Sequence, residues 1–398
     1  MNPISQHLAS RGLSPSDFLV ITKLPVDVLN DDFDVERLSA SQLKVAAQVL
    51  GIPEYLLFST RSSKLKRLPL DFRSTGNAKV VHTKYSLSAV YQSYSNSEFI
   101  SLIERHVNIK GRFPDLREDQ TPIERMRVLF NCDSASDLFY LDPISLFKKL
   151  RTNAEDSGLF VFVDDVVDTS FRGFCFKDDH RNFVFINRRH FNVRSRIFTL
   201  AHEVAHLLQG HPGIIDPVGH RSSVERQTNR LAAEFLISLS TLTEYLPANA
   251  EKQEIPELLS YLHSRLPFSK FFLAMRLQEL GGSFSGIVNK WLKLVNVKDL
   301  PNSYGTQELA QYEHEIDQLE SQSDDDLDVE AIRRQGSGGR QVSRLGSRTL
   351  ETIEIARQQN IVSVFDVQSS LGLPAKYYEK TIASLRRQLA EVQRYGPS

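Results

Sequence analysis

The chain has 398 residues, of which 41% are hydrophobic and 24% charged, and its formal net charge is −1. This composition is typical of a soluble protein of two or three domains, and it excludes a global attraction to nucleic acid or to membranes. Two cysteines, Cys132 and Cys175, are too few for a disulfide framework, and no apolar run reaches 18 residues, so we expect a cytoplasmic protein with no membrane partner.

Residues 1–60 are predicted to form a helical domain of four or five short helices. The run RGLSPSDFLVITKLPVDVL, followed by LKVAAQVLGIPEYLLF, resembles the XRE (lambda-repressor-like) helix-turn-helix family. The resemblance implies a recognition region over residues 25–34, which carries neither Lys nor Arg but four acidic residues, namely Asp27, Asp31, Asp32 and Asp34. Because phosphate contact needs positive charge, a domain for protein contact or dimerisation is an alternative to a DNA reader.

Residues 61–115 are predicted to hold a linker and a helical segment, with a helix over 97–107. The linker begins with RSSKLKRLPLDFR. Its basic side chains suit a solvated linker as well as they suit a nucleic-acid patch.

Residues 116–245 are predicted to form a catalytic domain, which begins with helices over 121–130 and 143–153. From Gly158 the pattern changes to short runs of β-forming residues. Three strands are predicted, over 159–163, 171–176 and 182–187, with Asp178-Asp179-His180 as the turn before the third. They predict a small sheet, whose edge could hold an extended peptide or could serve only as scaffold.

The segment SRIFTLAHEVAHLLQGH, residues 195–211, contains an HExxH pattern that begins at His202. Apolar residues surround the pattern at helical spacing, which predicts a buried helix with a polar start near Ser195 and an end at Gly210. Residues i and i+4 share one face of a helix, so His202 and His206 can bind one metal ion. Glu203 lies beside that face, where its carboxylate can take a proton from a water at the metal. Two unrelated histidines would show the same spacing, but burying them without partners is costly.

A third metal ligand is expected from the next predicted helix, over 224–238. Glu225, 19 residues after His206, can complete a two-His, one-Glu zinc site with a water in the fourth position. Asn229, one helical turn further on the same face, can orient a ligand histidine.

The loop between the two helices offers alternative ligands in His211, Asp216 and His220. The longer HExxHxxGxxH pattern is not fulfilled, because Gln209 and Pro212 stand where it needs Gly and His.

The segments RIFTLAHEVAHLLQGHPGIID and VERQTNRLAAEFL resemble the ImmA/IrrE family of zincin metallopeptidases, and the resemblance extends over about residues 60–290. It implies that the glutamate of the second segment, Glu225, is a metal ligand. It also implies a protein partner that is cleaved, a repressor or an antitoxin, in a phage, mobile-element or stress circuit. The sequence departs from the family pattern at Ala205, where Gly is common, and at Ser238, where Pro is common.

The remaining chain divides into three predicted parts. Residues 246–300 form helices over 258–266, 270–280 and 284–294, as helical support or as a segment like a helix-turn-helix. Residues 301–346 are polar, with acidic and Gly/Ser runs, and are predicted to be a flexible linker. Residues 347–398 form a helical module that could hold a partner or a second copy of the chain, with helices over 348–359, 364–371 and 376–394.

Cys175 belongs to the middle one of the three predicted strands, just before the HExxH helix. A thiolate near zinc could act as a redox switch. A buried structural cysteine is the alternative.

These patterns predict an α+β, predominantly helical protein with a zincin-like core, a small sheet plus the HExxH helix, between helical N- and C-terminal domains. The predicted activity is that of a gluzincin-like zinc endopeptidase in which Glu203 is the base. His211 and His220 are candidates to stabilise the transition state, and the sequence assigns neither of them. Manganese would also suit two histidines and a carboxylate. Two other functions fit the sequence: a DNA- or protein-binding regulator with an inactive or structural metal site, and the toxin of a toxin–antitoxin pair.

Overall fold

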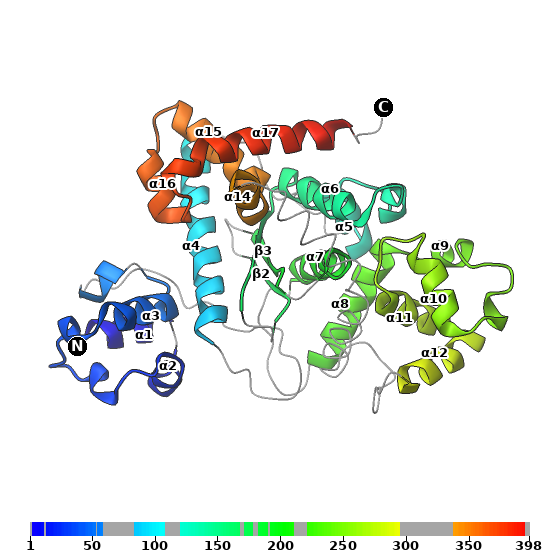
Figure 1. Ribbon diagram of the computed structural model, residues 1–398, viewed down its shortest axis with the longest axis horizontal. Coiled ribbons are helices and arrows are strands. Elements are labelled where there is room, and N and C mark those ends of the chain that lie inside the picture. Colours follow the sequence, from blue (N-terminus) through cyan, green and yellow to red (C-terminus); the bar gives the residue numbers. More distant parts are fainter. Residues whose placement is uncertain are drawn as a thin grey trace.

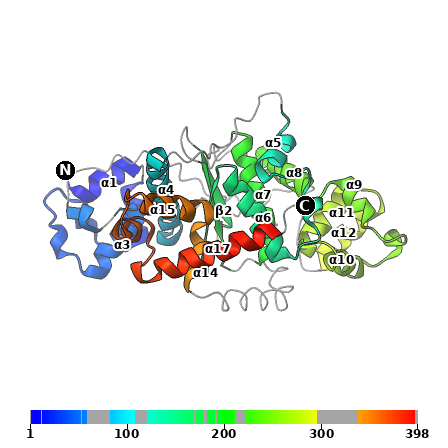
Figure 2. The ribbon, with the colours of Figure 1, turned by 90° about the horizontal axis from the view of Figure 1, so that it is seen from above.

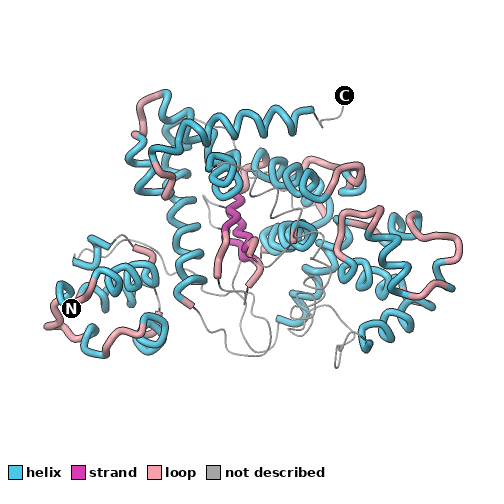
Figure 3. The backbone as a smooth tube through the Cα atoms, viewed as in Figure 1, coloured by secondary structure: helices cyan, strands magenta, loops and turns pink. Residues whose placement is uncertain are grey.

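The computed structural model describes residues 2–11, 13–52, 54–58, 83–107, 120–167, 171–177, 182–189, 192–210, 221–294 and 337–394. Most of these residues are helical, and they include one three-stranded sheet (Figure 3), so the prediction of a largely helical α+β protein is confirmed. The sheet lies in the middle of the molecule, between the N-terminal helices at one end and α9–α12 at the other (Figures 1 and 2). None of the described helices has the length and apolar character needed to cross a membrane.

The N-terminal helices pack around their own apolar residues, among them Ile4, Leu8, Phe18 and Leu50, each at most 2% exposed. They comprise α1 (Pro3–Arg11), α2 (Pro15–Thr22) and α3 (Ala40–Leu50), with short 3-10 helices at Val26–Leu29, Val35–Arg37 and Glu54–Phe58. The recognition region implied over residues 25–34 thus holds one 3-10 turn and no α-helix. Its acidic side chains face solvent, and the resemblance to a helix-turn-helix stays a prediction.

Helix α4 (Lys84–Val107) begins 13 residues before the helix predicted over 97–107. The sequence hid this start, because the first half of the helix is rich in serine. Serine hydroxyls inside a helix can bond to its own carbonyl groups; Ser97 Oγ donates to Tyr94 O at 2.8 Å. These small polar residues let other elements pack closely, and Ser86, Ser93, Ser97 and Ser101 are all buried.

The sheet consists of β1 (Phe160–Asp164), β2 (Gly173–Lys177) and β3 (Asn182–Asn187), in the order β1-β3-β2. β1 runs parallel to β3 with Phe160 opposite Phe183, and β2 runs antiparallel with Gly173 opposite Ile186. β2, the middle strand in chain order, therefore lies at an edge of the sheet. The predicted turn at residues 178–180 and the basic linker at 61–73 lie outside the described residues.

The two faces of the sheet differ in chemistry, because side chains alternate along a strand. Phenylalanines of all three strands form the outer face, which we call the phenylalanine layer: Phe160, Phe162, Phe174, Phe176, Phe183 and Phe185. Rings of this layer stack, as Phe174 and Phe185 do at 4.9 Å between centroids, and α4 covers it through Tyr94, whose ring meets Phe176 edge-on at 5.4 Å.

The inner face of the sheet is aliphatic, and helix α7 (Val193–Leu208) packs on it. Helices α5 (Pro122–Phe130), α6 (Pro143–Asp156) and α8 (Arg221–Leu236) surround α7. The predicted start of α5 is confirmed: Thr121 and Glu124 form a reciprocal capping box.

Four helices follow α8 and pack against one another beside α7: α9 (Leu239–Glu244), α10 (Ile255–His263), α11 (Lys270–Leu280) and α12 (Ser283–Leu294). Phe198 of α7 and Phe272 of α11 lie with their ring centroids 5.5 Å apart. Arg194 Nη1 in the first turn of α7 donates to Leu266 O at 2.6 Å. These contacts place α9–α12 beside the helix that carries the HExxH pattern.

The prediction of a flexible linker over 301–346 is wrong for its last residues, because Ser337–Leu345 forms helix α14. Residues 301–336 lie outside the described residues. Gly338 does not loosen this helix but lets it approach α17 (Tyr378–Arg394) closely. A Cβ atom on Gly338 would lie 2.8 Å from Ser384 Oγ and even closer to Lys380 O. Helices α15 (Ser347–Gln358) and α16 (Val364–Leu371) complete the C-terminal part.

The C-terminal helices share a core with the N-terminal helices, α4 and the phenylalanine layer. A buried carboxylate of α6 and an ion pair to α4 join them to the rest of the chain. Glu155 of α6 accepts from Arg151 Nε at 3.0 Å and from Ser347 N at 2.8 Å. Arg348 donates to both carboxylate oxygens of Glu104 on α4, at 2.9 and 3.0 Å, and its guanidinium lies 4.6 Å from the Phe160 ring centroid.

We expect Glu155→Gln to lower the free energy of unfolding by about 3 kcal/mol, because Arg151 would stay buried without its counter-charge. Chemical denaturation of the full chain measures this. The control is Arg386→Gln, which removes an ion pair to Glu354 in which Arg386 is 67% exposed; its expected cost is below about 1 kcal/mol. Equal costs for the two variants would contradict a structural role for the Glu155 pair.

Candidate metal centre

Helix α7 is built to hold polar groups inside an apolar environment. Asn192 is the N-cap of this helix, because Asn192 Oδ1 accepts a hydrogen bond from Ser195 N at 2.9 Å. The cap thus lies three residues before the polar start that was predicted at Ser195. The helix ends at Leu208, and Gly210 follows with a φ of 74°, as predicted. Nearly every residue between is buried, which confirms the prediction of a buried helix.

The HExxH spacing brings two imidazoles together inside the protein. His202 is fully buried and His206 is 8% exposed. Their Nε2 atoms lie 2.9 Å apart, and the two rings meet edge-on with centroids 4.6 Å apart. Phe198, one turn before His202, lies with its ring centroid 5.9 Å from that of His202 and closes one side.

The third group comes from α8, which begins at Arg221, three residues earlier than predicted. Glu225 Oε1 lies 3.2 Å from His206 Nε2, and Glu225 Oε2 lies 3.5 Å from His202 Nε2. The side chain of Glu225 is 26% exposed, so solvent reaches the three residues in part from the side of α8. The structure thus brings together the three residues that the sequence singled out as ligands.

The distances fit one metal ion. Ligand atoms of the three residues all lie within 4.8 Å of one another. A tetrahedral zinc site with bonds of about 2.1 Å sets its ligand atoms about 3.4 Å apart, close to the observed 2.9, 3.2 and 3.5 Å. A cation placed among the two imidazole nitrogens and the carboxylate oxygens would accept lone pairs from all three groups.

Glu203 follows His202 in the chain and is 3% exposed. It lies against the edge strand, where Gly173 leaves room for it. A Cβ atom on Gly173 would lie 3.3 Å from Glu203 Cγ, and only 2.8 Å from both Thr199 Cγ2 and Phe185 O. The absence of a side chain at Gly173 therefore decides how closely β2 approaches the HExxH helix.

Helices α7 and α8 must keep a fixed separation for the three groups to meet. Thr228 is fully buried, and its Oγ1 donates to Gln209 Oε1 at 2.7 Å, which ties the first half of α8 to the end of α7. Asn229 is 3% exposed and follows Glu225 by one helical turn. The same face of α8 thus carries both residues toward the core.

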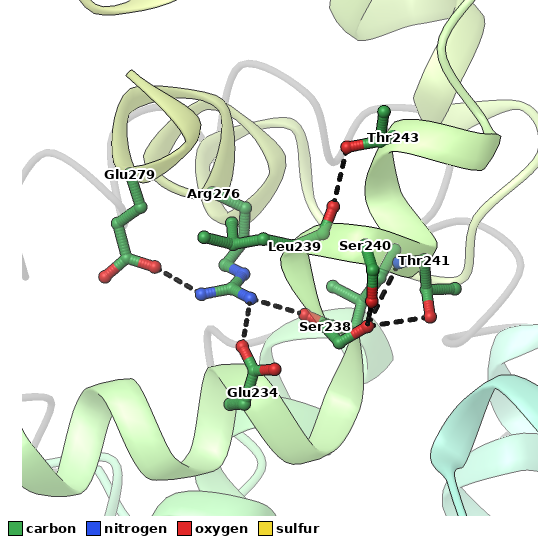
Figure 4. A network of polar contacts seen from close by, with 9 residues as sticks. Glu234, Ser238, Leu239, Ser240, Thr241, Thr243, Arg276 and Glu279 are labelled. Atoms are coloured by element: carbon green, nitrogen blue, oxygen red, sulfur yellow. Dashed lines mark hydrogen bonds and ion pairs between the residues drawn. The ribbon is translucent and has the colours of Figure 1, made fainter.

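A second polar network fixes the other end of α8 (Figure 4). Arg276 of α11 is 2% exposed and donates from Nη2 to Ile237 O at 2.7 Å and to Glu234 Oε2 at 2.8 Å, and from Nη1 to Glu279. Burial raises the pKa of Glu279, although the charge of Arg276 and their hydrogen bond oppose the shift. Ser238 then caps α9 through its Oγ, which accepts from Thr241 N at 3.0 Å.

Several predicted residues are not brought to the centre by the described structure. His211, Asp216 and His220 lie outside the described residues. Cys175 lies on the inner face of β2, 4% exposed, and no ligand atom of it belongs to the cluster. The other thiol, Cys132, has its pKa raised to about 12 by burial, so it is protonated and unreactive at neutral pH.

Gly173, Thr228 and Arg276 support the centre but were not singled out from the sequence. For Gly173 a signal existed, since a glycine inside a strand often marks close approach of another backbone or ligand. For Arg276 and Thr228 none existed, because their partners lie 39 and 19 residues away along the chain.

We expect Gly173→Ala to lower the free energy of unfolding by about 1–3 kcal/mol, because the new methyl group overlaps the backbone of β3 and the side chain of Thr199. Thermal or chemical denaturation measures the change. Gly286→Ala is the matched control, since a Cβ atom there meets nothing within 4 Å. It should be neutral or stabilising by up to about 1 kcal/mol in a helix. A neutral Gly173→Ala would contradict the tight contact between β2 and α7.

Comparison with protein families gives a match for residues 154–278, to the family described as IrrE N-terminal-like domain and named Peptidase_M78. The searches of curated proteins and of solved structures found no match. The matched region contains the whole sheet, α7 and α8, and hence His202, Glu203, His206 and Glu225. The match supports the predicted resemblance to the ImmA/IrrE family and a metallopeptidase-type function; residues 154–278 are similar to the IrrE N-terminal-like domain.

Proposed function

We propose that this protein is a zinc-dependent endopeptidase with a zincin-like core of the gluzincin kind. One observation carries the proposal: His202, His206 and Glu225 bring their ligand atoms within 4.8 Å of one another in a region similar to a peptidase family. In this proposal the three residues hold the metal. Two histidines and a carboxylate also suit manganese, so the identity of the metal is part of the test.

When bound, zinc supplies a Lewis acid that polarises the scissile carbonyl group and lowers the pKa of a water. Glu203 is the proposed general base: it takes a proton from the attacking water and passes it to the leaving amine. Its burial at 3% exposed supports this role, because a carboxylate away from bulk water exchanges protons with what is bound beside it. Asn229 is the proposed partner that orients a ligand histidine, and His211 and His220 remain candidates to stabilise the transition state.

The substrate peptide is proposed to bind along the edge strand β2. In the described part of the chain, β2 pairs on one side only, with β3. A peptide added to the other side would form backbone hydrogen bonds with β2, in the manner of an extra strand. Because Gly173 lies against Glu203, a peptide on this edge passes the proposed base.

The proposed substrate is a specific protein partner, a repressor or an antitoxin, as the family resemblance implies. The N-terminal helices are the proposed contact surface for that partner. Their exposed acidic residues favour a protein over DNA, since DNA contact depends on Lys and Arg. The chain belongs, in this proposal, to a phage, mobile-element or stress circuit.

We expect one zinc ion per chain in the wild-type protein and its loss in Glu225→Ala. The affinity for zinc should fall by at least about 100-fold, because mutation of a residue that only hydrogen-bonds to a ligand already lowers metal affinity by about 10–100-fold. Elemental analysis of the purified full chain measures the metal. Gln227→Ala, an exposed position on the same helix, is the control and should keep the ion. Wild-type protein that takes up no metal after zinc or manganese is offered would overturn the proposal.

We expect Glu203→Gln to keep the metal and to lose cleavage by roughly 10²–10⁴-fold, because only the proton transfer is removed. Mass spectrometry of new protein N-termini compares cells that express the wild type, Glu203→Gln or the control Glu244→Gln, an exposed glutamate on α9. Cleavage products should appear with wild type and control alone. Equal products with all three would exclude this site as the source, and loss of the metal in Glu203→Gln would make Glu203 structural.

A further inference from the structure

A cavity of about 300 Å³ lies on the other side of the sheet from the candidate metal centre. Three parts of the chain line it: Gln48 of α3, one face of α4, and Arg344 of α14. Phe162 and Phe185 of the phenylalanine layer form the side of the cavity that faces the sheet. The cavity therefore lies where the N-terminal helices, the sheet and the C-terminal helices meet, beside the first half of α4. Its size is that of a pocket for a small ligand.

Aromatic rings dominate the apolar part of the wall. Phe162 and Phe185 are buried, whereas Tyr85 is 43% exposed. Val167, 49% exposed, is another lining residue that leaves apolar surface in contact with solvent. Large apolar side chains left open around a hollow are typical of a binding site. Aromatic side chains in a cavity wall suit a planar ligand, because stacking of a heterocycle on an aromatic side chain contributes about 1–3 kcal/mol.

The polar part of the wall can pair with the edge of such a ligand. Gln48 and Gln92 line the cavity with exposed side-chain amides, which are available to a ligand in place of water. An amide offers a donor and an acceptor side by side, which matches the paired acceptor and donor of a purine edge. Ser88 and Ser93 add hydroxyl groups to the same wall.

The charged groups of the wall are balanced and already engaged. Lys84 and Arg344 oppose Asp164 and Asp165. Arg344 donates to Gln341 Oε1 at 3.0 Å and to Leu371 O at 2.6 Å, and Lys84 Nζ lies 5.0 Å from the Tyr85 ring centroid. Asp165 accepts from Arg188 at 2.9 Å. No surplus positive charge is thus available for a phosphate, so the wall favours an uncharged ligand.

We propose that this cavity binds a small, uncharged, planar heterocycle with hydrogen-bond donors and acceptors on its edge, of the size of a nucleoside. The site is distinct from the metal centre and does not depend on the proposed peptidase activity. A ligand there touches all three parts of the chain, so it holds them together.

Binding to the full chain is measured by calorimetry with adenosine, guanosine, cytidine and uridine, each beside its 5′-monophosphate. We expect at least one nucleoside to bind with a saturable 1:1 isotherm, more tightly than its monophosphate, and to raise the melting temperature. Ser88→Trp fills the cavity and should weaken that binding at least tenfold. Leu102→Trp, half-exposed on the same helix but outside the cavity, should leave it unchanged.

A tryptophan at position 88 could also prevent folding, so Gln92→Ala gives a second variant at an exposed position. Its circular dichroism should match wild type while nucleoside binding falls about tenfold, the worth of one lost hydrogen bond of about 1.4 kcal/mol. No binding of any nucleoside at millimolar concentration would overturn the proposal. Tighter binding of the monophosphate, or unchanged binding in a folded Ser88→Trp, would overturn it as well.

Discussion

Side chains alternate between the two faces of a β-strand, and in this protein that alternation separates two cores. Valine, isoleucine and Cys175 face α7, and the phenylalanine layer faces α4 and α14. A slip of one residue in any strand would exchange the two sets. The register of three short strands therefore decides which side of the molecule receives the HExxH helix and which side receives the N- and C-terminal helices.

The candidate metal centre depends on the inner of these two faces. Because α7 is buried against β2 and β3, its polar residues are held in a single orientation, and α8 reaches them from one side only. Thr228 holds the middle of α8 and Arg276 holds its C-terminal end, and these bonds help to keep Glu225 facing the histidines. Gly173 lets the edge strand approach within contact of Glu203. The residues of the candidate centre are few, but their positions depend on the sheet, on α7, α8 and α11, and on Gly173.

Local periodicity was enough to predict the parts of the structure that local physics determines. Helical spacing put His202 and His206 on one face, and a capping residue located the start of α5 at Thr121. The predicted bounds of α16, Val364 and Leu371, also agree with the structure. Glu225 needed more than spacing, since its meeting with His206 depends on how two helices pack. The resemblance to a known family supplied that step.

Long-range packing was not accessible from the sequence. The first half of α4 was not predicted, because the packing of this helix involves elements far away along the chain. Arg348 of α15, for example, pairs with Glu104 of α4, 244 residues earlier. The glycines before Leu345 indicated a linker, since nothing local shows that Gly338 packs against α17. There a small residue was mistaken for a flexible one, although it serves close contact between helices.

The late position of the C-terminal helices has a consequence for synthesis on the ribosome. Arg348 and α14 cover Phe160 and its neighbours, yet about 150 residues separate the end of β3 from the start of α14. At typical rates of translation, these residues take roughly 10–30 s to emerge. During that time the nascent chain carries the finished HExxH helix beside aromatic rings that still lack part of their cover. The core that the phenylalanine layer shares with the C-terminal helices can therefore form only after α14 and α15 have been synthesised.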